Sequence, residues 1–228
     1  MQSSDFENKR KNIVNRLKAE GILRSPAMIR AISIIPREEF VLESMKDSAY
    51  IDSPLPIYDG QTISAPHMVA IMCEVLELAP GQKVLEVGAG SGYHAAVTAE
   101  IVAPSDSHLK GHVYTVEIHK RLGEFARKNL EKTCYNDRVT VIERDGSKGL
   151  PEEAPFERIL VTATAPSIPK PLTDQLKTDG ILVIPVGDLY AFQELILARK
   201  REDNVIDTKS VCGVTFVPLL GKYGWRDK

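Results

Sequence analysis

Hydrophobic side chains in the first third of the chain recur every three or four residues, which is the spacing of one face of an α-helix. The positions that carry this spacing are Ile13, Leu17, Met28, Ala31, Ile32 and Ile35. Ser25 and Pro26 stand where an N-cap and a first-turn proline would open the second of these helices. Pro54 and Pro56 predict extended chain, and a further apolar helix is expected to begin within 64–66.

After Gly81 the pattern changes to short apolar runs that alternate with helical stripes. The runs that predict strands cover 83–88, 112–117, 139–142, 158–162, 180–184, 193–198 and 211–217. The stripes that predict helices cover 93–101, 122–130 and 172–176, the last of them ended by Gly180. Strands separated by helices indicate a parallel, doubly wound α/β fold. Because no helix separates the last two strands, we expect an antiparallel edge on a mostly parallel, seven-stranded sheet.

The chain has 228 residues and contains no repeat, low-complexity tract or Gly/Ser linker that would divide it. We therefore expect a single domain over 1–228, with an N-terminal helical segment at 1–79 and the doubly wound core at 80–228. A formal net charge of only −2 gives no field that would hold a polyanion, so no nucleic-acid partner is expected.

The sequence also gives expectations about compartment. No apolar run approaches the length of about 18 residues that a membrane span needs, so no membrane partner is expected. The polar N-terminus lacks the apolar stretch of a signal peptide. The three cysteines, Cys73, Cys134 and Cys212, are far apart and form no CxxC pair. A reducing, cytoplasmic location fits this pattern best, and we expect a monomer or a weak oligomer.

Between the first strand and first helix of the core lies Glu-Val-Gly-Ala-Gly-Ser-Gly, and the residues of interest are Glu86, Gly88, Gly90, Ser91 and Gly92. Glycines here let a ligand approach the backbone at the carboxyl end of a strand, where doubly wound sheets bind ligands. The spacing is not that of a dinucleotide or P-loop motif. It resembles motif I of the class I S-adenosylmethionine-dependent methyltransferases, whose fold is Rossmann-like, and implies S-adenosyl-L-methionine as cofactor.

Companion residues stand at the ends of the next strands. Glu117 can accept hydrogen bonds from both ribose hydroxyls of a nucleoside, and a solvated strand-end glutamate is the less favoured alternative. Asp145 and Gly146 stand where methyltransferases of this class place an acidic residue against the adenine amino group, but Asp-Gly is also a turn signal. Thr162, at the end of the fourth strand, is expected to contact the cofactor as well.

The fourth-strand end, 162–166, is uncharged and carries none of the motifs typical of amino-methylating, arginine-methylating or metal-dependent methyltransferases. Such a site suits an acceptor that arrives already nucleophilic, as an ionised carboxylate does. No metal-ligand spacing links the five histidines, so no metal is expected.

Several segments taken together resemble the protein-L-isoaspartate (D-aspartate) O-methyltransferases over about residues 20–220. They are 61–66, 84–92, 95–97, 129–130, 145–146, 154–156, 165–166, 175–177 and 185–187. The resemblance implies methyl transfer to the free carboxylate of L-isoaspartyl residues in damaged proteins and peptides, with S-adenosyl-L-homocysteine as product. It also implies that Gln61, Thr62, Ile63 and Ser64 close over cofactor and acceptor, with Ser64 as the active-site serine.

Other interpretations stay open at this level. Ser64 could be only the N-cap of the helix that follows it. The chain could methylate a small-molecule carboxylate or hydroxyl, or bind the cofactor as a regulatory module. Two segments depart from the family pattern: 103–111 is longer than usual, and 221–225 is hard to align.

Overall fold

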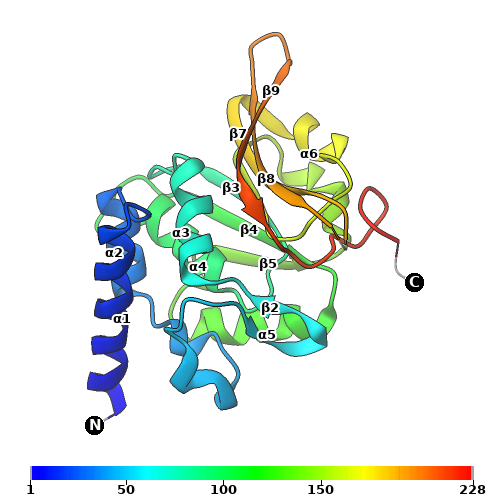
Figure 1. Ribbon diagram of the computed structural model, residues 1–228. Helices are drawn as coiled ribbons and strands as arrows, with labels where there is room; N and C mark the ends of the chain where they lie inside the picture. The colour runs from blue at the N-terminus through cyan, green and yellow to red at the C-terminus, as the bar shows by residue number, and fades with distance from the viewer. Residues whose placement is uncertain (1, 190, 227–228) are drawn as a thin grey trace.

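The computed structural model describes residues 2–189 and 191–226, and Figure 1 shows a twisted central sheet with helices on both faces. The sheet has seven strands in the order β5-β4-β3-β6-β7-β8-β9. Their bounds are β3 Lys83–Val87, β4 His112–Glu117, β5 Val139–Glu143, β6 Phe156–Val161, β7 Leu176–Gly187, β8 Gln193–Lys200 and β9 Ile206–Val214. Strands β3 to β7 are parallel, whereas β8 is antiparallel to both β7 and β9. The predicted mostly parallel sheet with an antiparallel edge is confirmed.

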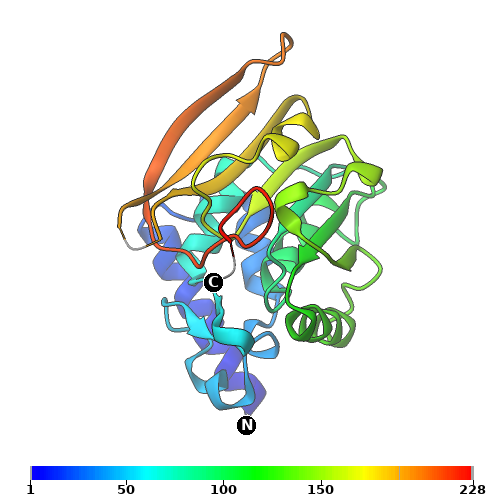
Figure 2. The same cartoon turned by 90° about the vertical axis from the view of Figure 1, so that its right-hand side faces the viewer.

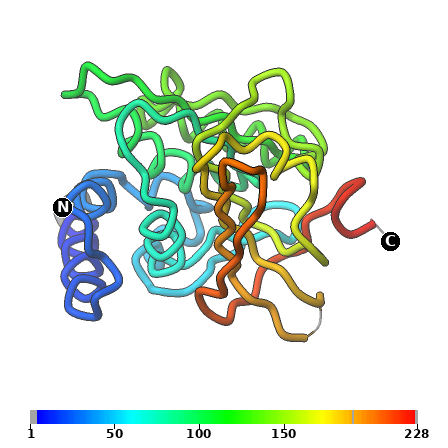
Figure 3. The backbone as a smooth tube through the Cα atoms, turned by 90° about the horizontal axis from the view of Figure 1, so that it is seen from above, coloured from blue at the N-terminus to red at the C-terminus, as the bar shows by residue number. Residues whose placement is uncertain are grey.

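Six α-helices, five short 3-10 helices and a small hairpin make up the rest of the described secondary structure. The helices are α1 Gln2–Ala19, α2 Pro26–Ile34, α3 Pro66–Val75, α4 Tyr93–Val102, α5 Lys120–Lys132 and α6 Lys170–Asp174, and the hairpin pairs β1 Leu55–Pro56 with β2 Thr62–Ile63. Seen from above, the N-terminal helices and the C-terminal loop lie at opposite sides of the molecule (Figure 3). The predicted N-cap of α2 is present, because Ser25 Oγ accepts a hydrogen bond from Met28 N at 3.2 Å.

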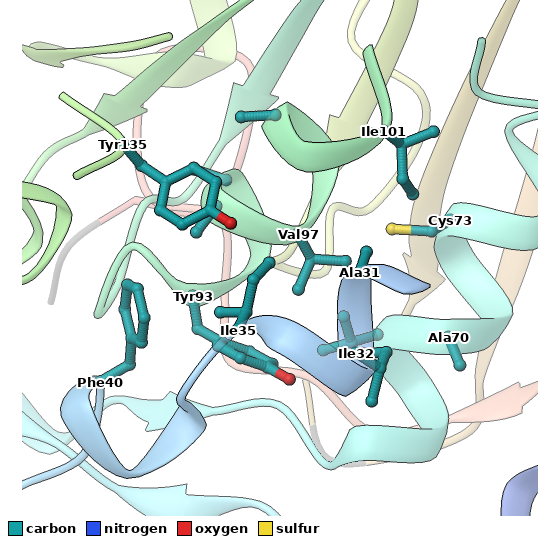
Figure 4. Close-up of a cluster of buried hydrophobic side chains, with 14 of the residues drawn as sticks. Ala31, Ile32, Ile35, Phe40, Ala70, Cys73, Tyr93, Val97, Ile101 and Tyr135 are labelled. Carbon is teal, nitrogen blue, oxygen red and sulfur yellow. The ribbon is translucent and has the colours of Figure 1, made fainter. Parts of the chain in front are cut away.

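The N-terminal segment is built into the core. Figure 4 shows Ile32 of α2 and Ile35, the C-cap residue of that helix, meeting Cys73 of α3 and Val97 of α4 in one buried cluster. Every residue of α4 is buried, because α2 covers the side that a surface helix would expose. On the sheet itself, Met72 and Leu76 pack against Leu160, Ile181, Val183 and Leu195 of β6, β7 and β8. Helix α3 thus covers the half of the sheet where the connection after β6 contains only the short α6.

Two boundaries differ from the sequence prediction. The helix expected over 172–176 and ended by Gly180 stops at Asp174, and β7 begins at Leu176, which pairs with Phe156. The last strand, expected over 211–217, lies at Ile206–Val214. The first half of this strand is exposed and polar, so the hydrophobic pattern does not predict it. The apolar residues after Val214, which the prediction included, leave the sheet edge and run toward Thr164.

Strand order reverses direction at β3. The chain adds β4 and β5 on one side of β3 and then crosses to place β6 on the other side. In doubly wound sheets, ligands bind outside the carboxyl ends of the strands at such a switch point. The loops after β3 and β6 therefore mark where a site is expected.

Candidate functional site

A cavity opens at this switch point, between the loops that follow β3, β4 and β6. Most of the residues predicted for the site line it, namely Gln61, Thr62, Ile63, Ser64, Gly88, Gly90, Ser91, Glu117, Gly146 and Thr162. Glu86, Gly92 and Asp145 lie close by but outside the lining. Val87, Val116, Ile118 and Leu122 contribute apolar surface, so the cavity combines apolar walls with a few polar groups, as small-molecule sites do.

The glycine loop has the backbone conformation that its sequence predicts. Gly88, Gly90 and Gly92 have φ values of 100°, 53° and 85°, in the region that favours glycine. A Cβ at Gly88 would overlap the Thr162 hydroxyl, which donates a hydrogen bond to the Gly88 carbonyl at 2.8 Å. Gly92 stands at the start of α4 and packs against Leu130 and Ala126 of α5. The loop is therefore held from both β6 and α5.

Glu117 lies at the end of β4 with its carboxylate against this loop. One oxygen accepts a hydrogen bond from Gly90 N at 2.9 Å, and the other accepts from His119 N at 3.0 Å. The residue is only 5% exposed, yet it lines the cavity. Because each carboxylate oxygen can accept two hydrogen bonds, each retains capacity for a ligand hydroxyl.

Glu86 lies in the interior beneath the loop. Its side chain is fully buried, and Thr115 Oγ1 donates to Oε2 at 2.5 Å, whereas Oε1 has no partner among the described residues. Burial raises the pKa of Glu86 to about 8, despite the hydrogen bond from Thr115. At neutral pH this side chain is therefore largely the neutral acid.

Asp145 faces the C-terminal tail. Its Oδ2 accepts a hydrogen bond from Lys222 N at 2.9 Å, and its Oδ1 accepts from Ser147 N and Ser147 Oγ at 3.0 and 2.6 Å. Partial burial would raise the pKa of Asp145, but the hydrogen bonds from Ser147 and Lys222 lower it on balance. Contact with an adenine amino group stays a prediction for this carboxylate.

Ser64 follows the β1–β2 hairpin at the mouth of the cavity. The N-cap of α3 is Ala65, with no side-chain cap, so Ser64 does not serve as that helix's cap. Its hydroxyl makes no hydrogen bond to the part of the chain that the structure describes, while its carbonyl accepts from Arg37 at 2.7 Å. Arg37 is completely buried and also donates to the Ala49 carbonyl, fixing the backbone beneath the serine.

A second cavity joins the first. The two share Thr62, Ser64, Thr162 and Val217 in their linings. The outer cavity is otherwise mostly apolar, with Met68, Phe192, Val214 and Phe216 among its walls. His67 also lines the outer cavity, and its ring Nδ1 is hydrogen-bonded to Asp52 Oδ1 at 2.9 Å. A ligand in either cavity would therefore lie beside Ser64.

Sequence reasoning missed some of the lining. Residues 217–220 form part of the cavity wall, and no local sequence signal marks them. Only the path of the chain after β9 brings them to the cavity.

His94 also lines the cavity, and its Nε2 lies 3.3 Å from Cys73 Sγ. Burial, and then the nearby Arg37, lower the pKa of His94 to about 3, so the ring is neutral.

Two further findings concern metal binding and membrane-spanning helices. No group of three or more His, Cys, Asp or Glu in residues 2–189 and 191–226 is placed to hold a metal ion. Within the same residues, no helix combines the length and apolar character needed to cross a membrane.

Comparison with known proteins shows a full-length match. Residues 8–224 match the family model described as protein-L-isoaspartate(D-aspartate) O-methyltransferase. A relative of that name from Hyperthermus butylicus is 57% identical, covering 97% of this chain and 92% of its own. One from Thermococcus sibiricus is 51% identical over all of both chains.

Solved structures agree. A protein-L-isoaspartate O-methyltransferase superposes with a TM-score of 0.84 at 30% identity, covering 94% of this chain and 67% of that one. A second, from Plasmodium falciparum and described as a putative protein-L-isoaspartate O-methyltransferase, is in complex with S-adenosyl-L-homocysteine. It gives a TM-score of 0.79 at 28% identity and covers 92% of this chain and 98% of that one.

Proposed function

The chain belongs to the protein-L-isoaspartate(D-aspartate) O-methyltransferase family, and we propose that the two joined cavities are its cofactor and acceptor sites. The enzyme transfers the methyl group of S-adenosyl-L-methionine to the free carboxylate of L-isoaspartyl residues in damaged proteins, which initiates their repair. The observation that carries the site proposal is the set of residues common to both linings, because methyl donor and acceptor must meet there.

The inner cavity suits the cofactor. The glycine loop leaves room at the carboxyl end of β3, and Glu117 retains acceptor capacity for ribose hydroxyls. The neighbouring apolar side chains, among them Ile118 and Leu122, suit the flat adenine ring. The bound cofactor supplies an electrophilic methyl group on a sulfonium. We assign the roles predicted from the sequence to Gln61, Thr62, Ile63, Ser64, Gly88, Gly90, Ser91, Glu117, Gly146 and Thr162, with Glu86, Gly92 and Asp145 supporting them from outside the lining.

The outer cavity suits the acceptor peptide. An isoaspartyl carboxylate is ionised at neutral pH, so the reaction needs no general base. The Ser64 hydroxyl, free of hydrogen bonds to the described residues, donates to this carboxylate and orients it. The described residues in the walls of this cavity are mainly apolar and carry no base aimed at the acceptor, so catalysis rests on proximity and orientation. Arg37 keeps Ser64 in place from below.

The test is replacement of Ser64 by Ala, with Ser33→Ala, exposed on α2, as matched control. We expect kcat with an isoaspartyl peptide to fall at least tenfold, because an unoriented carboxylate spends less time in line with the methyl group. The dissociation constant for S-adenosyl-L-homocysteine should stay within a few-fold. Full turnover in the Ser64 variant would exclude the serine from the reaction.

The same proposal extends to partners and location. With a net charge of −2, the enzyme acts on proteins and peptides rather than nucleic acid or membranes. Its cysteines are all free, which suits the reducing cytoplasm, and we expect a monomer or a weak oligomer.

A further inference from the structure

The wall formed by residues 217–220 belongs to a segment that has left the sheet. Thr164, just beyond β6, makes two backbone hydrogen bonds to this segment. Thr164 N donates to Val217 O, and the Thr164 carbonyl accepts from Leu219 N, each at 2.8 Å. Beyond Leu220 the chain turns back on itself, because Gly221 N donates to Trp225 O at 3.1 Å and Trp225 N donates to Leu219 O at 2.7 Å. Figure 2 shows this loop in red in front of the strand ends.

The loop is tied down at two separate strand ends. After β5, Asp145 Oδ2 accepts from Lys222 N at 2.9 Å and Ser147 Oγ accepts from Tyr223 N at 3.0 Å. After β6, the Thr164 carbonyl accepts from Trp225 Nε1 at 3.1 Å. Gly221 has a φ of 137°, and a Cβ there would overlap the Asp145 carboxylate, so glycine is required for the loop to approach so closely.

We propose that residues 221–225 are a latch that holds the 217–220 wall against the cofactor, and that Asp145 is a positioning residue acting on cofactor affinity through this latch. The proposal rests on the function above, in which the inner cavity holds the cofactor. It differs from the expectation that Asp145 binds the adenine amino group directly, because the carboxylate already spans Ser147 and the Lys222 amide and lies outside the lining.

The physical effect is preorganisation. With the latch closed, 217–220 is ordered before the cofactor arrives, so binding does not include the entropy cost of ordering that wall. Opening the latch at any attachment should therefore weaken binding. It should leave turnover at saturating cofactor nearly unchanged, because none of the latch attachments lines the outer cavity. Val217, the one residue of the wall that does, is held by its own hydrogen bond from Thr164 N.

The test is a double-mutant cycle on the full chain, with S-adenosyl-L-homocysteine affinity read by calorimetry. Gly221→Ala pushes the loop off Asp145, and Asp145→Asn leaves an amide donor facing either Lys222 N or Ser147 N. Each should weaken binding about tenfold, and the double variant no further, because both open the same latch. Arg226→Ala, exposed next to Trp225, is the matched control with wild-type affinity.

Losses that multiply to about a hundredfold would show Asp145 acting on the cofactor directly and overturn the proposal, as would unchanged affinity in Gly221→Ala. Should that variant fold poorly, Trp225→Phe, which removes the Nε1 donor together with part of the indole ring, takes its place with the same expectation. Two readouts on the latch variants separate a latch from general destabilisation. The KM for S-adenosyl-L-methionine rises while kcat stays within twofold, and amide exchange rises at 222 and 223 without the cofactor.

If amide exchange rises in the variants but wild-type protein binds no S-adenosyl-L-homocysteine, the proposed cofactor site fails, and the latch's role in binding fails with it.

Discussion

Glu117 shows how one side chain can shape a loop and still be available to a ligand. Its two oxygens hold the amides of Gly90 and His119, so replacement by Gln leaves one of those amides facing an NH2 group. Hydrogen bonds to charged groups contribute about 1.5–3 kcal/mol. We expect Glu117→Gln to weaken S-adenosyl-L-homocysteine binding by about ten- to a hundredfold.

Glu143 provides the matched control, since it pairs with Glu117 across β4 and β5 but is exposed and outside the cavity. Calorimetry on both Gln variants should show the loss at Glu117 alone. Equal affinities for the two proteins would mean that Glu117 does not contact the cofactor.

Glu86 gives a prediction for the dependence of stability on pH. Its pKa is raised by burial to about 8 in the folded protein, against about 4.3 in an unfolded chain. Between these pH values the native side chain keeps a proton that the unfolded chain releases, so the free energy of unfolding falls as pH rises, by about 1.4 kcal/mol per unit for this group. This decrease in the free energy of unfolding levels off above about pH 8, where the native side chain also loses its proton.

Replacing Glu86 by Gln removes this proton exchange while keeping the shape. In urea unfolding without cofactor, the variant should gain stability relative to wild type steadily from pH 5 to pH 8. A constant difference between the two proteins over that range would show that Glu86 is already ionised in the fold.

Among the elements, those whose sequences carry both a periodic pattern and a turn signal were predictable. The segment from β3 through the glycine loop to α4 is of this kind, and so is the Ser25 cap of α2. The start of β7 was not, because 176–180 reads as the end of a helix until Leu176 pairs with Phe156. Strand β9 was displaced in the prediction because its exposed half has the polarity of a loop.

The site followed the same rule. Residues predicted from motifs lie around one cavity, whereas Arg37 and the 217–220 wall were missed. Arg37 is far from Ser64 in sequence, and nothing local distinguishes it from an exposed arginine. Residues 217–220 gain their position from contacts with Thr164, which only the tertiary structure supplies.

Arg37 also links two elements, since it donates from the turn after α2 to the backbone at Ala49 and Ser64. Arg37→Met fills similar volume but leaves both carbonyls without this donor in the interior. We expect the free energy of unfolding to fall by about 2–6 kcal/mol, at about 1–3 kcal/mol for each of the two carbonyls. In the folded fraction kcat should fall more than cofactor affinity, because Ser64 is the group displaced. Urea unfolding and steady-state kinetics measure the two effects; equal losses in kcat and affinity would contradict a role centred on Ser64.

At the scale of the whole molecule, the N-terminal segment and the sheet share one core. Residues of 1–79 and of 80–228 lie in the same buried cluster, which includes Ile32, Cys73 and Tyr93. We propose that the chain unfolds as a single domain. Differential scanning calorimetry should show one transition with equal calorimetric and van't Hoff enthalpies. A separate, earlier transition for the helical segment would mean that it folds on its own.

In the proposed arrangement, donor and acceptor occupy two cavities whose linings share Ser64 and Thr162. Isoaspartyl and aspartyl carboxylates are both ionised at neutral pH, so the enzyme must distinguish them by position. In the isoaspartyl form the backbone runs through the side-chain methylene, which leaves the free carboxylate one carbon closer to the chain. A misplacement of about 1 Å can lower a rate about a hundredfold.

The most direct test is therefore methyl transfer from labelled S-adenosyl-L-methionine to two peptides that differ only in an L-isoaspartyl or an L-aspartyl linkage. We predict a kcat/KM at least a hundredfold higher for the isoaspartyl peptide, and label in its free carboxylate as a methyl ester. Comparable rates on the two peptides would contradict selection by geometry in the joined cavities.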